Sequence, residues 1–233
     1  MAKSSRRYKK LEKRITQPTY TPLEAIKLLP ELSTVNFIET VDVHIALGLD
    51  PKYADQQLRA TVILPKGTGK AVKVAVIAQG EQVADAISFG ADVAGSQDLI
   101  EDISKGRLDF DRLIATPDVM PAIAKLGRIL GPKGLMPSPK AGTVTSNLSQ
   151  SIAEFKAGKL EYRVDRSGIV HLPCGKVNFH GNDLLLNLIS IKESIEKNRP
   201  SGAKGKYWKS VYISTTMSPS LPIDVNLFRD LSV

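Results

Sequence analysis

Residues 72–78 read VKVAVIA, a stretch in which Lys73 is the only polar residue. Strands that are buried on both faces of a sheet have such nearly continuous apolar runs. Segments with helical and strand patterns alternate after it: a helix at 81–88, a short apolar stretch at 91–94, a helix between Ser96 and Gly106, a strand at 113–115 and a helix opened by Thr116 and Pro117. This β-α-β-α order predicts a parallel sheet covered by helices on both faces, a three-layer α/β/α Rossmann-like domain.

The chain on either side of this region has a different pattern. TVDVHIALG alternates apolar and polar residues, with Val41, Val43, Ile45 and Leu47 on one face, which predicts a half-buried strand. LRATVILP, residues 58–65, is expected to pair with that strand as a long hairpin. Residues 160–173 read as strand, turn and strand with the turn at 165–168, and residues 208–217 read as a further strand. The pattern is that of an antiparallel sheet.

Two helices are expected to accompany these strands. Thr21, Pro22 and Glu24 form the pattern of a capping box, which predicts the start of a short amphipathic helix. A second helix is predicted from about Asn182 to Asn198. The first and last thirds therefore share an α+β character that the middle lacks. We predict a discontinuous α+β domain of residues 1–67 plus 160–233, which carries an inserted α/β domain of residues 68–159.

The composition excludes several classes of protein. No apolar run approaches the roughly 18 residues that a membrane-spanning helix needs. The basic N-terminus has no apolar segment behind it, so no secretory signal is expected. One cysteine, Cys174, and three scattered histidines cannot form a disulfide or a thiolate zinc site. A reducing compartment is expected, with neither a metal nor a cofactor.

The net charge of +8 indicates a polyanionic partner. Residues 1–14 carry seven basic side chains and one acidic side chain, which predicts a mobile basic arm. A second basic cluster, RPSGAKGKYWK at 199–209, contains two aromatic residues and no acid. Lysine and arginine contact phosphates, and aromatic side chains stack on bases, so nucleic-acid binding fits these clusters best.

Enzymatic alternatives have little support in the motifs. A dinucleotide-binding fold needs G-x-G-x-x-G after its first strand, but only Gly80 follows VKVAVIA. PKGTGKA, which begins at Pro65, has the wrong glycine spacing for a P-loop. No nucleophile elbow, zinc-protease motif or pair of catalytic acids is present. A nucleotide-binding α/β enzyme remains the alternative, and only the α/β insert favours it.

Several stretches resemble one known family. GRILGPKGLMPSPKAGTV, residues 127–144, is similar to the signature of the bacterial-type ribosomal protein L1 family, whose members lie in the mobile lateral stalk of the large subunit. Further similar stretches are NFIETVDVHIALGLDP, ATPDVM, KAGKLEYRVDRSGIVH and PSGAKGKYWKSVYISTTM. The loop at 127–145 lies in the nearly neutral insert, so it serves as a family fingerprint more than as a binding site.

The resemblance implies a non-enzymatic ribosomal protein whose discontinuous domain binds the ribosomal RNA of the stalk. It also implies a role in the release of deacylated tRNA from the exit site and translational repression of its own mRNA. The RNA-binding positions that it implies are Phe37, Glu39, Thr40, Arg166, Ser167, Gly168, His171, Ser210, Thr216, Met217 and Ser218. From the residues alone, His171 reads as an ordinary strand histidine.

Two positions depart from the family pattern. Ser218 stands where a glycine is usual, so its Cβ must be accommodated or must shift the turn. Asn36 stands where a basic residue is common, which removes a possible phosphate contact. The expected location is a bacterial cytoplasm, on the ribosome, with the stroma of a plastid as the alternative.

Overall fold

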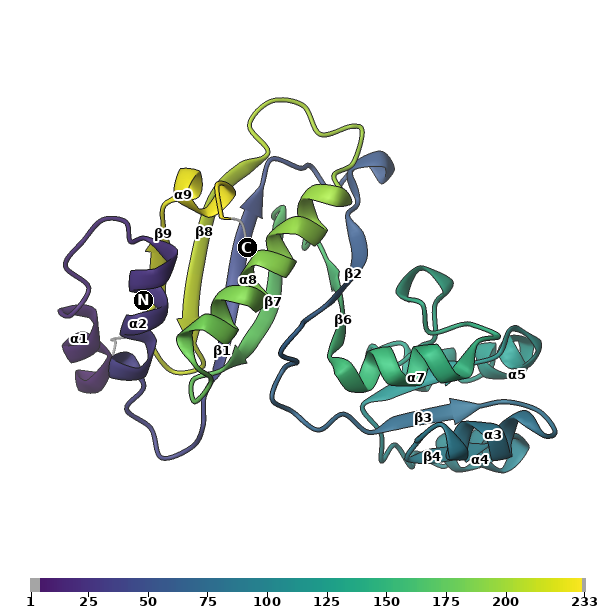
Figure 1. Ribbon diagram of the computed structural model, residues 1–233. Helices are drawn as coiled ribbons and strands as arrows, with labels where there is room; N and C mark the ends of the chain where they lie inside the picture. The colour runs from purple at the N-terminus through teal and green to yellow at the C-terminus, as the bar shows by residue number, and fades with distance from the viewer. Residues whose placement is uncertain (1–4, 232–233) are drawn as a thin grey trace. The chain divides into compact units, whose positions relative to one another are not determined.

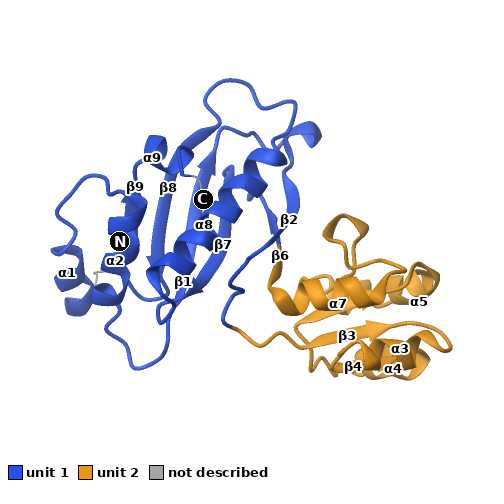
Figure 2. Ribbon diagram, viewed as in Figure 1, with its two compact units in different colours: residues 1–69, 161–233 blue, residues 70–160 orange. Residues whose placement is uncertain are grey.

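The computed structural model describes residues 5–231, which form two compact units (Figures 1 and 2). Unit 1 comprises Met1–Gly69 and Glu161–Val233, and unit 2 comprises Lys70–Leu160. The chain therefore leaves unit 1, forms unit 2, and returns. Strands and helices occur together in both units, so the protein is a mixed α and β protein, as predicted.

Unit 1 is built on a four-stranded antiparallel sheet with the order β7-β1-β8-β9. The elements of this unit are α1 (Arg6–Glu12), α2 (Pro22–Leu32), β1 (Thr40–Leu47), η1 (Ala54–Gln56), β2 (Arg59–Ile63), β6 (Lys159–Arg163, which begins at the boundary), β7 (Ile169–Lys176), α8 (Gly181–Lys197), β8 (Trp208–Thr215), β9 (Leu221–Ile223) and α9 (Val225–Arg229). The capping box of α2 is present as predicted, with Thr21 and Glu24 each bonded to the other's backbone N–H.

The alternation in β1 is confirmed. Val41, Val43, Ile45 and Leu47 are buried, while the residues between them are partly exposed. Helices α2 and α8 pack on the buried side of the sheet (Figure 1). The opposite face carries the alternate side chains of β7, β1 and β8, and no described helix of unit 1 covers it. These side chains are Asp42, His44, Ala46, Ile169, His171, Pro173, Ser210, Tyr212 and Ser214. We call this surface the open face.

The predicted hairpin between β1 and residues 58–65 is wrong. β1 is paired along one edge with β7 and along the other with β8, so neither edge is available to a third strand. β2 instead pairs with β6 in a separate two-stranded ribbon. The prediction of strand, turn and strand over 160–173 is right, but β6 and β7 belong to different sheets. Val164, just after β6, forms an isolated bridge with Val170 of β7.

Unit 2 contains a three-stranded parallel sheet with the order β4-β3-β5. All four residues of β3 are buried, as the apolar run predicts. One hydrophobic cluster joins the sheet to α4, α5 and α6, and another joins it to α3 and α7, so helices cover both faces. The elements are β3 (Val74–Ile77), α3 (Gln82–Ser88), β4 (Val93–Gly95), α4 (Gln97–Ser104), β5 (Arg112–Ala115), η2 (Pro117–Val119), α5 (Met120–Ala124), α6 (Gly127–Leu130), η3 (Pro139–Ala141) and α7 (Leu148–Ala157).

The glycine- and proline-rich stretch at 127–145 is anchored to this sheet. The Thr143 hydroxyl accepts a hydrogen bond from the Ser138 N–H at 2.7 Å and donates to the Ser138 carbonyl. Val144 forms a parallel bridge with Ala115 at the end of β5. The stretch is therefore a fixed extension of the unit 2 core. No described helix is long and apolar enough to cross a membrane.

Asn187 is a fully buried polar residue of α8 that connects three parts of unit 1. Its side-chain oxygen accepts from the Lys66 N–H, and its amide nitrogen donates to the carbonyls of Gly67 and Cys174. Replacing it with leucine leaves three backbone groups without partners. Asn187→Leu should therefore lower the free energy of unfolding by about 3 kcal/mol, measured by urea denaturation. The same change at the exposed Asn182 should have little effect, and equal losses for the two variants would contradict this account.

Candidate nucleic-acid interface

The candidate residues lie in unit 1 around β1, at its two ends and on the open face between them. At the end of the sheet where β1 begins and β8 ends, the Thr216 N–H donates a hydrogen bond to the Thr40 carbonyl. This bond places the 216–218 turn beside Phe37, Glu39 and Thr40. Arg166, Ser167, Gly168 and Ser210 lie toward the other end, where Ala46 faces both Ile169 and Ser210. Val41 and Ala46, which mark the two ends, are about 17 Å apart along the strand. The candidates therefore form one elongated surface.

Glu39 is the buried centre of the first group, with 1% of its surface exposed. One carboxylate oxygen accepts a hydrogen bond from the Thr215 hydroxyl at 2.9 Å, and the other accepts from the Met217 N–H at 2.9 Å. A carboxylate bound by two donors of a neighbouring segment fixes the position of that segment. Glu39 is thus a positioning residue, and in this conformation its carboxylate is not available to a ligand.

Apolar side chains project to solvent from the segments that Glu39 connects. Phe37 is 53% exposed and Met217 is 46% exposed, and Ile38 lies between Phe37 and Glu39 with 60% of its surface exposed. Large apolar side chains that remain this exposed beside polar ones are typical of a binding surface. Such side chains can stack on or pack against the bases of an RNA loop.

Two hydroxyl groups form hydrogen bonds at the same end of the sheet. The Thr216 Oγ1 accepts from the Thr40 N–H at 3.2 Å, so this hydroxyl already holds the two segments together in the free protein. The Ser218 hydroxyl accepts from the Thr215 N–H at 3.0 Å and donates to the Pro219 carbonyl. No described residue other than glycine has a positive φ. The Cβ of Ser218 is therefore accommodated, and the serine itself closes the turn.

The basic N-terminal segment adds a feature that the sequence interpretation missed. Residues 6–12 form α1, so the mobile arm predicted for residues 1–14 is wrong over the described part, and residues 1–4 lie outside it. The Arg7 guanidinium donates to the Met217 carbonyl at 3.1 Å and to the Thr34 hydroxyl at 3.2 Å. Leu11 is buried and Arg14 donates to the Glu31 carbonyl.

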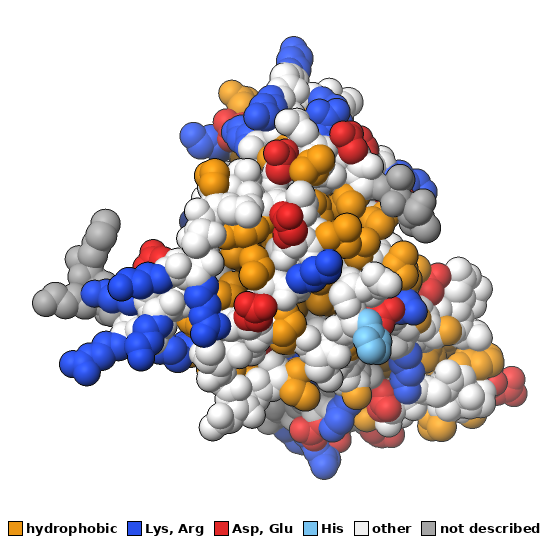
Figure 3. Space-filling model, turned by 60° about the vertical axis from the view of Figure 1, so that its left-hand side comes forward, with side chains coloured by type: hydrophobic (Ala, Val, Ile, Leu, Met, Phe, Trp, Pro, Cys, Tyr) orange, Lys and Arg blue, Asp and Glu red, His pale blue; other side chains and the backbone are white. Residues whose placement is uncertain are grey.

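This docking brings a basic helix next to the apolar and hydroxyl groups around Met217. The exposed basic side chains of the segment are Arg6, Lys9, Lys10, Lys13 and Arg14. Lys and Arg side chains gather at the left of the face drawn in Figure 3, while hydrophobic side chains lie toward its middle. The excess of basic residues in 1–14 was visible in the sequence, but the hydrogen bond to Met217 was not.

At the other end of β1, the turn at 165–168 is held by the Asp165 carboxylate. Asp165 accepts hydrogen bonds from the N–H groups of Ile169 and Ser167, each at 2.8 Å, and these bonds lower the pKa of its carboxyl group. Gly168 has a φ of +80°, and a Cβ there would lie 2.9 Å from the Leu49 carbonyl oxygen. This glycine is required by the turn itself. Arg166 and Ser167 are exposed on it.

A chain of polar groups crosses the open face from this turn to β8. The His171 Nε2 lies 3.5 Å from the Asp165 carboxylate, the Nδ1 atoms of His171 and His44 are 2.8 Å apart, and the His44 Nε2 lies 3.3 Å from the Ser214 hydroxyl. Because Asp165 only accepts, His171 must donate from Nε2 and accept at Nδ1. His44 then donates from Nδ1 and accepts from Ser214. The Ser214 oxygen is left as an acceptor for a ligand such as a 2′-hydroxyl.

The groups on this surface are of the kinds that contact a ligand through packing, hydrogen bonds and ion pairs. It offers exposed apolar groups, hydroxyls, basic side chains and oriented imidazoles. Within residues 5–231, no three or more His, Cys, Asp or Glu residues are placed to hold a metal ion.

Comparison with known proteins gives the family. Residues 29–219 match the ribosomal protein L1p/L10e family. The chain is 64% identical over 231 residues to the large ribosomal subunit protein uL1c of Gracilaria tenuistipitata var. liui, covering 99% of this chain and 98% of the relative. It is 61% identical to the uL1c protein of Guillardia theta, with 99% and 98% covered, and 62% identical to the uL1 protein of Synechococcus elongatus, with 99% and 98% covered.

The chain therefore belongs to the ribosomal protein L1 family, as the resemblance indicated. The family consists of ribosomal proteins, which confirms the expectation that the chain is not an enzyme.

The role of Glu39 can be tested by Glu39→Gln. The new amide group has one acceptor oxygen and no charge, so the two charge-assisted hydrogen bonds to Thr215 and Met217 cannot both be kept. We expect the free energy of unfolding to fall by about 1–3 kcal/mol in urea denaturation. Glu31→Gln, at an exposed position, is the matched control and should change stability little. An unchanged stability of the Glu39 variant would exclude a positioning role.

The polar chain on the open face predicts how His44 titrates. Burial, followed by repulsion from His171, lowers the pKa of His44 below its ordinary value of 6.5, and Asp42 opposes these effects. His44 should therefore stay neutral as the pH falls through 6.5, which ¹⁵N NMR of the imidazole can measure. His171→Gln removes the repulsion from the neighbouring imidazole, so the titration midpoint of His44 should move upward. An unchanged midpoint in that variant would contradict the direct coupling of the two rings.

Proposed function

We propose that the chain is a structural protein of the large subunit of a bacterial-type ribosome and binds the ribosomal RNA of the lateral stalk. The RNA site would be formed by residues 36–40 and 215–218, with the open face and the 165–168 turn as its continuation. The names of the similar proteins, all large ribosomal subunit proteins, support the assignment to that subunit.

The observation that carries the RNA site is the clamp formed by Glu39. It holds the 215–217 segment against the start of β1, and it does so with a buried carboxylate. Phe37 and Met217 consequently stay exposed in fixed positions, beside Thr216 and Thr40. A preorganised surface of this kind loses little entropy when it binds.

We further propose that the RNA-binding domain is the discontinuous one, residues 1–67 plus 160–233, and that residues 68–159 form a Rossmann-like insert. The division into compact units at Gly69 and Glu161 supports these limits to within two residues. All eleven candidate residues lie in unit 1. In unit 2, the parallel sheet with helices on both faces supports the description of the insert.

Two further roles follow from the family resemblance. The chain would assist the release of deacylated tRNA from the exit site, and it would repress translation of its own mRNA through a leader that resembles the stalk RNA. The ribosome would be that of a bacterial cytoplasm or of a plastid stroma. Relatives from a cyanobacterium and from plastid-bearing algae, named uL1 and uL1c, support both locations.

The alternative of a nucleotide-binding enzyme has no motif to support it. Residues 78–81 connect strand β3 to α3 and contain a single glycine, Gly80, so the glycine-rich turn that holds a pyrophosphate is missing. Family membership also favours the ribosomal role.

Thr216→Val tests the proposed RNA site. The variant removes the hydroxyl that accepts from the Thr40 N–H, and we expect it to weaken binding of stalk RNA by about 1–3 kcal/mol in a filter-binding assay. Thr216→Ser keeps the hydroxyl and should retain most of the affinity. Met217→Ala should also weaken binding because it removes an exposed apolar contact. Wild-type affinity in both the valine and the alanine variants would exclude this site.

A further inference from the structure

A charged groove lies in unit 1 beside the β2–β6 ribbon, away from the Phe37 and Met217 end of the sheet. Its volume is about 780 Å³. We propose that this groove binds the phosphate backbone of a second RNA segment through Arg163 and Arg166. The proposal rests on the proposed function, since it assumes that an RNA is already held at the 36–40 and 215–218 segments.

The lining of the groove favours a polyanion. Six of its eleven lining side chains are arginines, carboxylates or a histidine: Arg59, Glu161, Arg163, Asp165, Arg166 and His171. Sites for small organic ligands are predominantly apolar, with only a few polar groups. With three arginines and two carboxylates, the groove has a net charge of +1 when His171 is neutral. This charge and lining fit a sugar-phosphate chain better than an apolar ligand.

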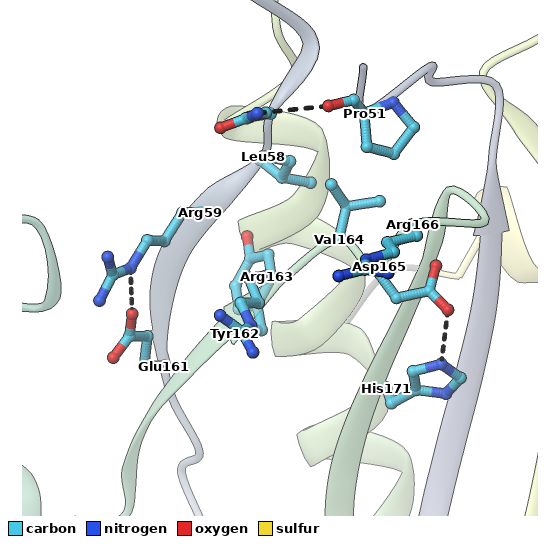
Figure 4. A pocket seen from close by; sticks show the side chains of 11 residues that line it. Pro51, Leu58, Arg59, Glu161, Tyr162, Arg163, Val164, Asp165, Arg166 and His171 are labelled. Carbon is cyan, nitrogen blue, oxygen red and sulfur yellow. Dashed lines mark hydrogen bonds and ion pairs between the residues drawn. The ribbon is translucent and has the colours of Figure 1, made fainter. Parts of the chain in front are cut away.

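The two carboxylates are already engaged by groups of the protein. Glu161 forms an ion pair with Arg59 across the ribbon. Asp165 accepts from the N–H groups of Ser167 and Ile169 and lies beside the His171 Nε2. In Figure 4, Arg163 lies between the Arg59–Glu161 pair and the Asp165–His171 pair, and Arg166 lies beside Asp165.

Arg163 and Arg166, in contrast, make no ion pair or side-chain hydrogen bond with any other residue in the described range 5–231. Both residues are exposed. Guanidinium groups bind phosphate oxygens in a planar, two-pronged geometry, and no internal carboxylate competes for these two.

The backbone fixes the direction of these side chains. Side chains alternate along β6, and Tyr162 points to the covered side, where it is 2% exposed and its hydroxyl bonds to Ser194 of α8 at 3.0 Å. Its neighbours Glu161 and Arg163 must therefore point to the opposite side, into the groove.

The groove is also continuous with the open face. Asp165 and His171 line the groove and at the same time begin the chain of polar groups that leads through His44 to Ser214. An RNA that covers the open face at His171 therefore meets the groove at a side chain that both surfaces share.

The first experiment compares Arg163→Gln and Arg166→Gln with the double variant Arg59→Gln/Glu161→Gln in the full chain. Binding of stalk RNA is measured over a series of salt concentrations. Each single variant should weaken binding about three- to tenfold and reduce the slope of log K against log salt by about 0.7–0.9, because one phosphate contact is lost. The double variant alters the same groove with no change in net charge, so it should bind within about twofold of the wild type.

Two outcomes of this experiment would overturn the proposal. One is wild-type affinity and salt slope in both single variants. The other is a loss in the double variant as large as that in the single variants, which would indicate a role for groove shape instead of phosphate contacts. Thr216→Val, measured in parallel, separates the two proposals. If Thr216→Val weakens binding and neither Arg163→Gln nor Arg166→Gln does, the site at 36–40 and 215–218 stands and the groove site fails.

A second experiment shows where the RNA lies. Cys174 is buried, and burial raises the pKa of its thiol to about 12, so it resists modification and an introduced cysteine can be labelled selectively. An iron chelate is attached at Gln57→Cys, which lines the groove, or at the exposed Asn36→Cys near Phe37. Hydroxyl radicals from the two positions should cleave different nucleotides of the stalk RNA. Cleavage of the same nucleotides from both, or none from Gln57→Cys, would contradict a second segment.

Free phosphate compounds provide the last comparison. Inorganic phosphate and adenosine monophosphate at millimolar concentration should compete only weakly with stalk RNA, since each offers one phosphate group. If adenosine monophosphate binds as tightly as the RNA and displaces it from the Gln57→Cys position, the groove is a nucleotide pocket and the proposal is wrong.

Discussion

The buried carboxylate of Glu39 is the interaction on which the candidate RNA surface depends. It lies at the start of β1 and binds two donors of a segment that follows about 175 residues later in the chain, Thr215 and Met217. A buried carboxylate is stable only when its oxygens are paired, so the two segments must stay together for the carboxylate to remain buried. Through Met217 the same arrangement extends to Arg7, whose guanidinium binds the Met217 carbonyl, and hence to the basic helix α1.

β1 provides the frame for this interaction. It is hydrogen-bonded on both edges, one face is buried under α2 and α8, and the other face is open. The Glu39 clamp lies at one end of the strand, the polar chain from Asp165 to Ser214 crosses its middle, and the arginine groove lies beyond β7. The surface therefore changes from apolar and hydroxyl groups at one end to arginines at the other. This gradient suits a folded RNA, which presents unstacked bases in its loops and phosphates along its helices.

The local elements were largely predictable from the sequence because their signals are local. The capping box at Thr21 and Glu24, the period of two in β1 and the apolar run of β3 each depend on residues that are close in the chain. The errors concern partners that are distant in sequence. The partner of β2 is β6, about 100 residues later, and an alternating pattern does not say which of several strands will pair with it. Likewise, the charge of residues 1–14 indicated an anionic partner, but only packing shows that Leu11 is buried and α1 is docked.

By itself, the sequence determined the class of the main strands and of α2 and α8, the change from antiparallel to parallel pattern near residue 68, and the family, because these depend on periodicity and on the identity of neighbouring residues. The tertiary structure alone decided what the functional residues do. Glu39, Thr216 and Gly168 occur in motifs that suggest RNA contact, yet the first two hold segments together and the third meets the steric demand of a turn. The groove at Arg163 and Arg166 also emerges only in three dimensions, because whether a charge is free or paired depends on distances between residues that lie far apart in the chain.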